Sequence, residues 1–139
     1  MFTLKDLSLM CGLSERTLRN YLKMGILTGE KKEGVWTFCK EDIEKMFKNP
    51  FAKGAIKATK KAIFFDFVNE KHTKNSACII LDLPEQSAFK TSAFFCNAVN
   101  KRTGLKMRFD SEGGTNRVVL SGDEKTVFDV LKEYHEELD

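Results

Sequence analysis

Apolar residues recur at the spacing of a helix near the start of the chain, and the pattern is clearest within residues 13–27. Three of them follow the i, i+3, i+4 spacing of a helix with one buried face: Leu18, Tyr21 and Leu22. Ser14 can cap the start, because a serine hydroxyl accepts a hydrogen bond from a free backbone N–H of the first turn. Gly25 can end the helix, because glycine adopts the left-handed conformation at no steric cost. The pattern predicts one helix with an apolar face and a polar, basic face.

A shorter helix is expected just before it. Thr3 and Asp6 have the spacing of a capping box, and leucine and methionine side chains follow them. Gly12 ends this first helix and begins a tight turn into the second one. Two short helices joined by a turn that contains glycine predict a helix-turn-helix.

A hairpin is expected over residues 28–38. Two short extended segments lie on either side of a polar loop at residues 29–34, which is bounded by glycines and basic at its tip. A further helix is predicted over residues 41–47, because acidic side chains stand in its first turn, where the helix dipole favours them. Pro50 follows the end of this helix and prevents its continuation.

Residues 50–70 are expected to form a helix that links the two halves of the chain. Pro50 suits the first turn of a helix, and the apolar residues that follow keep helical spacing. Aromatic side chains are dense in residues 62–69 and also favour strands, so a strand over residues 63–68 is the competing prediction. The aromatic density indicates burial against the second half or against a partner chain.

The second half has the pattern of a β-α-β-β-α unit. Residues 77–83 form a nearly continuous apolar run, which is typical of an interior strand. The other predicted elements are a helix at 85–102, a strand at 105–110, a turn at 111–116, a strand at 117–120 and a last helix with apolar positions from 127 to 138. The chain is therefore expected to be α+β. Its expected parts are an N-terminal domain at 1–49, a linking helix at 50–70 and a dimerisation or ligand-sensing domain at 71–139.

The charge differs between the two halves of this 139-residue chain. Residues 1–61 contain 13 Lys and Arg against 7 Asp and Glu, a net charge of +6, whereas residues 62–139 contain 10 against 13, a net charge of −3. A basic half joined to an acidic half indicates a module that binds a polyanion. No apolar run is long enough to span a membrane, and the N-terminus lacks the pattern of a signal peptide. The protein is therefore expected in the cytoplasm, with no membrane partner.

The sequence lacks the motifs of common enzymes. Its four cysteines are scattered without a C-x-x-C pair, and its two histidines lie far from them in sequence, so buried free thiols are expected and a metal site is not. It has no nucleophile elbow or phosphate-binding loop, and Gly113-Gly114 is followed by no predicted helix. We therefore predict no catalytic residue, no metal and no cofactor, and expect that the protein is not an enzyme.

Four stretches of the first half carry a family pattern: residues 3–7, 12–21, 25–27 and 41–43. The most specific part is the run Ser-x-Arg-Thr-Leu-Arg-x-Tyr, followed by Gly-Ile-Leu. Together, residues 3–48 resemble the winged helix-turn-helix of the MerR family of bacterial transcription regulators. The resemblance implies binding to double-stranded DNA as a homodimer. It implies that the recognition helix at 14–24 lies in the major groove and that the hairpin, or wing, at 28–38 lies on the flanking backbone.

Seven residues of the recognition helix are candidate DNA-binding residues by this resemblance: Ser14, Arg16, Thr17, Arg19, Asn20, Tyr21 and Lys23. Ser14, Arg16 and Thr17 open the helix and would face base edges or nearby phosphates. Arginine suits this place because it can donate two hydrogen bonds to guanine in the major groove. Arg19 and Tyr21 would contact or brace the backbone. The other role open to Tyr21 is that of a core aromatic with its hydroxyl at the surface.

The wing supplies three further candidates: Lys31, Lys32 and Trp36. The lysines would meet phosphates, and Trp36 would contact DNA or pack under the wing. The chain departs from the family pattern in two places, because Asn20 stands where the family has a second aromatic and residues 34–38 lack the wing arginine. Arg16 and Arg19 would therefore carry more of the contact with DNA than the family pattern asks of them.

The leading prediction is a sequence-specific transcription regulator that acts as a homodimer. One alternative is an architectural DNA-binding protein, because the related excisionase-type modules share the winged fold. Another is a ligand-sensing or protein-interaction module dominated by the second half. The strand-helix-strand-strand order of that half is similar to the repeating unit of the gyrase-inhibitor-like ligand domains attached to some MerR-type regulators. A small-molecule effector is therefore a further candidate partner.

Overall fold

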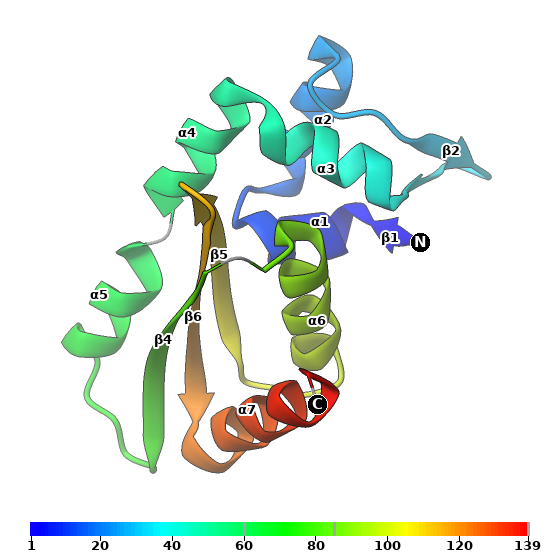
Figure 1. The fold of residues 1–139 in the computed structure, drawn as a ribbon. Coiled ribbons are helices and arrows are strands. Elements are labelled where there is room, and N and C mark those ends of the chain that lie inside the picture. Colours follow the sequence, from blue (N-terminus) through cyan, green and yellow to red (C-terminus); the bar gives the residue numbers. More distant parts are fainter. Residues whose placement is uncertain (60, 85, 139) are drawn as a thin grey trace.

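The computed structural model describes residues 1–59, 61–84 and 86–138. Helices make up 53% of the chain and strands 26%, so the predicted α+β class is confirmed. The strands form two antiparallel sheets of three strands each, and the helices pack around the larger sheet (Figure 1). In the part of the chain that the structure describes, no helix is long and apolar enough to cross a membrane.

The first half begins with the predicted helix, turn, helix and hairpin. Its elements are β1 (Phe2–Thr3), α1 (Leu4–Cys11), α2 (Glu15–Met24), β2 (Glu30–Lys32), β3 (Val35–Phe38) and α3 (Lys40–Lys48). Both predicted caps are confirmed, since the backbone N–H of Asp6 donates to Oγ1 of Thr3 at 3.2 Å and that of Thr17 donates to Oγ of Ser14 at 3.1 Å. The two helices end in left-handed glycines, as predicted: Gly12 and Gly25.

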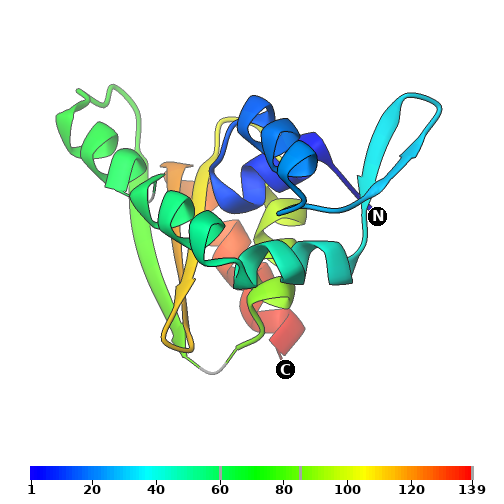
Figure 2. The ribbon, with the colours of Figure 1, turned by 90° about the horizontal axis from the view of Figure 1, so that it is seen from above.

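The smaller sheet has the order β1-β3-β2. The β2–β3 hairpin projects from the body of the molecule (Figure 2). Glu33 and Gly34 form its turn with positive φ angles of 50° and 79°, a conformation that matches the twist of paired strands. β1 could not be predicted from the sequence, because a strand of two residues leaves no periodic pattern.

Gly29, just before β2, has no room for a side chain. A Cβ atom there would lie 2.5 Å from the ring of Phe38 and 2.9 Å from the backbone oxygen of Thr37. We expect Gly29→Ala to lower the free energy of unfolding by about 1–3 kcal/mol, measured by urea denaturation. Gly54→Ala is the matched control, because a Cβ at Gly54 meets nothing within 4 Å and alanine suits the interior of a helix. Equal losses in the two variants would contradict this expectation.

Residues 50–70 contain two helices, α4 (Pro50–Thr59) and α5 (Lys61–Asn69), in place of the single linking helix that the sequence predicts. Lys60 lies outside the described residues. The competing prediction of a strand at 63–68 is wrong, because α5 contains this segment. The aromatic residues of α5 are not fully buried within the chain, since Phe64 is 41% exposed and Phe65 is 54% exposed, whereas the aliphatic Ile63 is 3% exposed.

The second half has the predicted β-α-β-β-α order. Its elements are β4 (Ser76–Pro84), α6 (Ala88–Asn100), β5 (Lys106–Glu112), β6 (Thr115–Asp123) and α7 (Glu124–Leu138). Glu85, the predicted start of the first of these helices, and the side chain of Leu138, a predicted apolar position, lie outside the described residues. Ser87 caps α6 by accepting from the backbone N–H of Lys90 at 3.2 Å.

The prediction that residues 77–83 form an interior strand is wrong. The larger sheet has the order β4-β6-β5, so β6 is central and β4 is an edge strand. A continuous apolar run usually indicates burial on both faces of a strand. In β4 only one face is well covered, because Ile79 and Leu81 pack against the core whereas Ile80 between them is half exposed.

Helices lie on both faces of the larger sheet. In Figure 1, α6 and α7 lie on one side of the strands and α5 on the other. The side chains of the central strand, β6, alternate between the two faces of the sheet. Val118 and Leu120 are buried in the main core. Val119 points to the opposite face of the sheet, where it is 4% exposed. The face that carries α5 is the one that is incompletely covered at β4.

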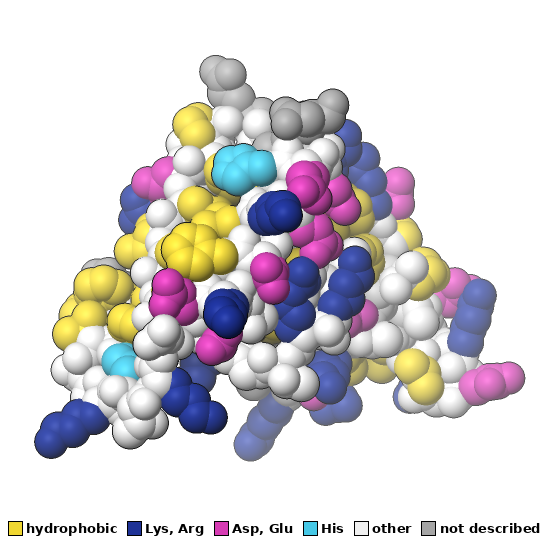
Figure 3. Space-filling view, turned by 90° about the horizontal axis from the view of Figure 1, so that it is seen from below, with side chains coloured by type: hydrophobic (Ala, Val, Ile, Leu, Met, Phe, Trp, Pro, Cys, Tyr) yellow, Lys and Arg dark blue, Asp and Glu magenta, His cyan; other side chains and the backbone are white. Residues whose placement is uncertain are grey.

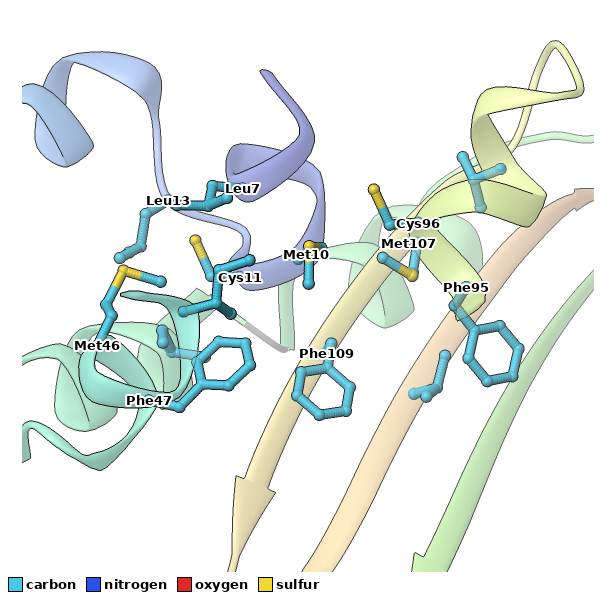
Figure 4. Close-up of a cluster of buried hydrophobic side chains, with 14 of the residues drawn as sticks. Leu7, Met10, Cys11, Leu13, Met46, Phe47, Phe95, Cys96, Met107 and Phe109 are labelled. Carbon is cyan, nitrogen blue, oxygen red and sulfur yellow. The ribbon is translucent and has the colours of Figure 1, made fainter. Parts of the chain in front are cut away.

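A continuous hydrophobic core joins the two halves. Figure 4 shows side chains of α1 and α3 facing β5 and α6, and the rings of Phe47 and Phe109 have centroids 5.7 Å apart. Polar contacts fix α1 to α6 beside this core. The Sγ of Cys96 donates to the backbone oxygen of Asp6 at 3.6 Å, and Nδ2 of Asn100 donates to Oδ1 of Asp6 at 2.9 Å. The start of α1 is therefore held by the second half.

Candidate nucleic-acid interface

One face of α2 is buried and the opposite face is polar, basic and exposed. Leu18 is 0% exposed and anchors the helix in the core. Four sequence-predicted site residues lie exposed on the other face: Arg16, Arg19, Asn20 and Lys23. Among the described residues, none of these four side chains forms a hydrogen bond or an ion pair. Their donors are therefore free to meet a ligand.

Ser14 and Thr17 are already engaged at the start of α2. The Ser14 hydroxyl accepts from the backbone N–H of Thr17, and the two hydroxyl oxygens lie 2.9 Å apart. Ser14 is exposed, whereas Thr17 is half-buried. A hydroxyl has one donor and two acceptor sites, so the capping role leaves Ser14 able to make a further contact.

Tyr21 lies in the core, with 4% of its surface exposed. Its ring makes an edge contact with that of Phe51 of α4, with centroids 6.0 Å apart. Burial raises the pKa of Tyr21, and the nearby Cys11 adds to the rise. This burial favours the packing role among the two roles that the sequence left open.

The hairpin presents its lysines at the surface. Lys31 and Lys32 are both exposed. The ammonium of Lys31 lies 5.8 Å from the ring centroid of Trp36, and that of Lys32 lies 3.6 Å from a carboxylate oxygen of Glu30. Trp36 is half-buried and stacks on Phe38, with centroids 6.4 Å apart and planes 13° apart. Trp36 therefore packs under the hairpin and holds the lysine above it.

A hollow of about 340 Å³ lies between α2 and the hairpin. Arg19 and Lys31, twelve positions apart in sequence, both line it, together with Trp36 and Glu15. Lys5 of α1 also lines it, and the sequence analysis did not name this residue. Leu4 and Leu7 are buried, so helical spacing places Lys5 on the outer face of α1. The sequence carries no signal of what Lys5 faces there.

Six basic residues and four acidic residues occupy α2, the hairpin and the adjoining start of α1. The basic ones are Lys5, Arg16, Arg19, Lys23, Lys31 and Lys32, and the acidic ones are Asp6, Glu15, Glu30 and Glu33. An exposed, positively charged surface on a helix and a projecting hairpin suits a polyanion. It supplies donors that can reach phosphates and base edges, and it contains no nucleophile paired with a base.

The cysteines lie away from this surface or beneath it. Cys11 and Cys96 are buried free thiols, as predicted, and burial raises the pKa of each to about 12. Cys39 and Cys78 are free and half-buried. Within the described ranges, no group of three or more His, Cys, Asp or Glu residues is placed to hold a metal ion. No family model, curated protein or solved structure matches this chain.

Proposed function

We propose that this protein is a sequence-specific double-stranded DNA-binding regulator of transcription that acts in the cytoplasm as a homodimer. In this proposal α1, α2 and the β2–β3 hairpin form a winged helix-turn-helix. α2 enters the major groove, which is wide enough for a helix, and the hairpin lies on the flanking sugar-phosphate backbone.

The observation that carries the proposal is the exposed basic face of α2 next to the basic hairpin. Arg19 of α2 and Lys31 of the hairpin line one hollow, so a single phosphate backbone can meet both. Arg16 is exposed in the first turns of α2, the part of a recognition helix that contacts base edges. These placements support a division between base contacts and phosphate contacts.

Each candidate residue then has a role. Arg16 reads guanine through two donors, and Asn20 suits adenine. Arg19, Lys31 and Lys32 neutralise phosphates, and Lys23 adds charge toward the end of α2. Ser14 caps the helix and can contact a phosphate as well. The role of Tyr21, Thr17 and Trp36 is to pack beneath the DNA-binding surface. Their burial fixes the position of the helix and the hairpin that carry the exposed side chains.

The experiment is a random-site selection with the purified full chain, followed by affinity measurements at several salt concentrations. We expect one enriched sequence with two-fold symmetry, and an affinity that falls steeply as the salt concentration rises because phosphate contacts release counterions. Enrichment of no sequence, with only weak binding to all DNA, would refute the proposed sequence-specific function.

A further inference from the structure

The outer edge of β4 has the features of a strand-pairing surface. β4 is nine residues long, and β6 is its one strand partner within the described residues. Edge strands are usually protected from pairing by charged side chains, by prolines or by bulges. β4 contains one charged residue, Asp82, whose carboxylate oxygen lies 2.6 Å from Nε of Arg117 of β6. Its proline, Pro84, stands at the very end, so residues 76–81 contain neither a charged side chain nor a proline.

An exposed apolar surface lies beside this edge. Ile80, in the middle of β4, is 48% exposed on the face of the sheet that also carries α5. Phe64 and Val68 of α5 are 41% and 61% exposed, and their spacing of four residues puts them on the same flank of the helix. α5 packs against β6 and β5, and Glu70, just after the helix, pairs with Lys106 of β5 at 3.5 Å. Phe64 and Val68 therefore form an exposed apolar flank on a helix that lies on the same sheet face as Ile80.

Phe65 extends this surface toward solvent with 54% exposure. In the view from below, hydrophobic side chains lie on the left, on the side of α5, and a further hydrophobic patch lies nearer the middle of this face beside Lys, Arg, Asp and Glu side chains (Figure 3). We call the edge of β4 together with Phe64, Phe65, Val68 and Ile80 the β4–α5 surface.

The size of the β4–α5 surface suits a stable interface. The exposed fractions of Phe64 and Phe65 together equal about one phenylalanine side chain, or roughly 200 Å². Val68 and Ile80 add a similar amount, so the four side chains supply roughly half of the ~800 Å² that each partner buries in a standard interface. The backbone edge of a nine-residue strand can supply the remainder.

We propose that the β4–α5 surface is a homodimer interface, in which the β4 edges of two copies pair antiparallel about a two-fold axis. The second copy is the occupant that fits, because a strand edge is complementary to itself in antiparallel pairing and the same apolar side chains then meet across the axis. The two sheets become one sheet with the order β5-β6-β4-β4-β6-β5. This inference gives the homodimer of the proposed function its surface, and it does not depend on DNA binding.

The test is the molar mass of the full chain, measured by light scattering during size-exclusion chromatography over a dilution series. We expect the wild type to have the mass of two chains. Ile80→Lys places a charge on the sheet face beside the edge, and Val68→Glu places one on α5, so each is expected to halve the mass. Phe128→Lys is the control, because Phe128 of α7 is 58% exposed outside this surface, and it is expected to keep the wild-type mass. Circular dichroism melting checks that each variant is folded.

A wild-type mass of one chain at every concentration would overturn the inference. So would a dimer that survives both Ile80→Lys and Val68→Glu, or one that Phe128→Lys breaks equally well. The two proposals fail separately. A β4-dependent dimer that selects no DNA sequence refutes the proposed function alone, and a dimer that selects a sequence but survives both Ile80→Lys and Val68→Glu refutes this interface alone.

Discussion

Replacing Arg16 with alanine is expected to weaken binding to the selected DNA site by about 1–3 kcal/mol, a factor of roughly 5 to 150, and to relax the preference at one base pair. Arg16 is exposed on α2, and its guanidinium has no partner among the described residues, so the substitution disturbs no contact within the chain. The measurement is the affinity for the selected site and for a set of sites changed one base pair at a time.

Comparison with Lys32→Ala distinguishes a contact to a base from a contact to a phosphate. Lys32 lies on the hairpin, where a lysine meets phosphates and reads no base. Its removal is expected to weaken binding to all sequences by a similar factor and to lower the slope of log affinity against log salt by about one. Lys132 is exposed on α7, away from the basic surface, so Lys132→Ala should leave binding unchanged. If Arg16→Ala and Lys32→Ala gave the same uniform loss, the assignment of Arg16 to base contact would be wrong.

Replacing Phe109 with alanine is expected to lower the free energy of unfolding by about 3–5 kcal/mol. Phe109 of β5 is 1% exposed and contacts Phe47 of α3, so the substitution leaves a cavity where the two halves of the chain meet. The measurement is urea denaturation followed both by circular dichroism and by the fluorescence of Trp36. Because Trp36 lies in the hairpin and Phe109 in the larger sheet, coincident curves would show that both halves unfold together.

Phe128→Ala is the matched control for this prediction. The side chain is also phenylalanine, but it is 58% exposed on α7, so its loss should change the free energy of unfolding by less than about 1 kcal/mol. A loss at Phe109 no larger than that at Phe128 would contradict the packing described for the core. An early transition seen by Trp36 alone would show that the first half unfolds independently.

The parts of the fold that the sequence predicted are those determined by local chemistry. Thr3, Ser14, Gly12 and Gly25 begin or end helices through hydrogen bonds and backbone conformations that span only a few residues, and the structure confirms all four. The β5–β6 hairpin likewise follows from alternation on either side of Gly113-Gly114. Such signals need no information about the rest of the chain.

The errors arose where distant segments decide the outcome. The apolar run of β4 indicated an interior strand, but its place at the edge depends on where β6 returns, and no local pattern fixes that. The break of the linking helix into α4 and α5 is of the same kind. The aromatic residues in α5 could favour either a helix or a strand, and in the structure they belong to a helix that packs against β6 and buries Ile63.

The candidate site shows the same division. Helical periodicity placed Arg16, Arg19 and Lys23 on the exposed face of α2, as the structure has them. The burial of Tyr21 was open from sequence, because it depends on contact with Phe51 of α4. Which basic residues meet around one hollow also depends on the tertiary arrangement of the hairpin, which short-range patterns do not contain.

The way Asp6 is held has a practical consequence for protein engineering. Its carboxylate caps α1 through the backbone N–H of Thr3 at 3.0 Å and also accepts from Asn100, while its carbonyl accepts from Cys96. A fragment cut after residue 49 would lose both partners in α6 and would expose Phe47 to water. The basic helix and hairpin are therefore poor candidates for transplantation onto another protein, since their scaffold extends through the whole chain.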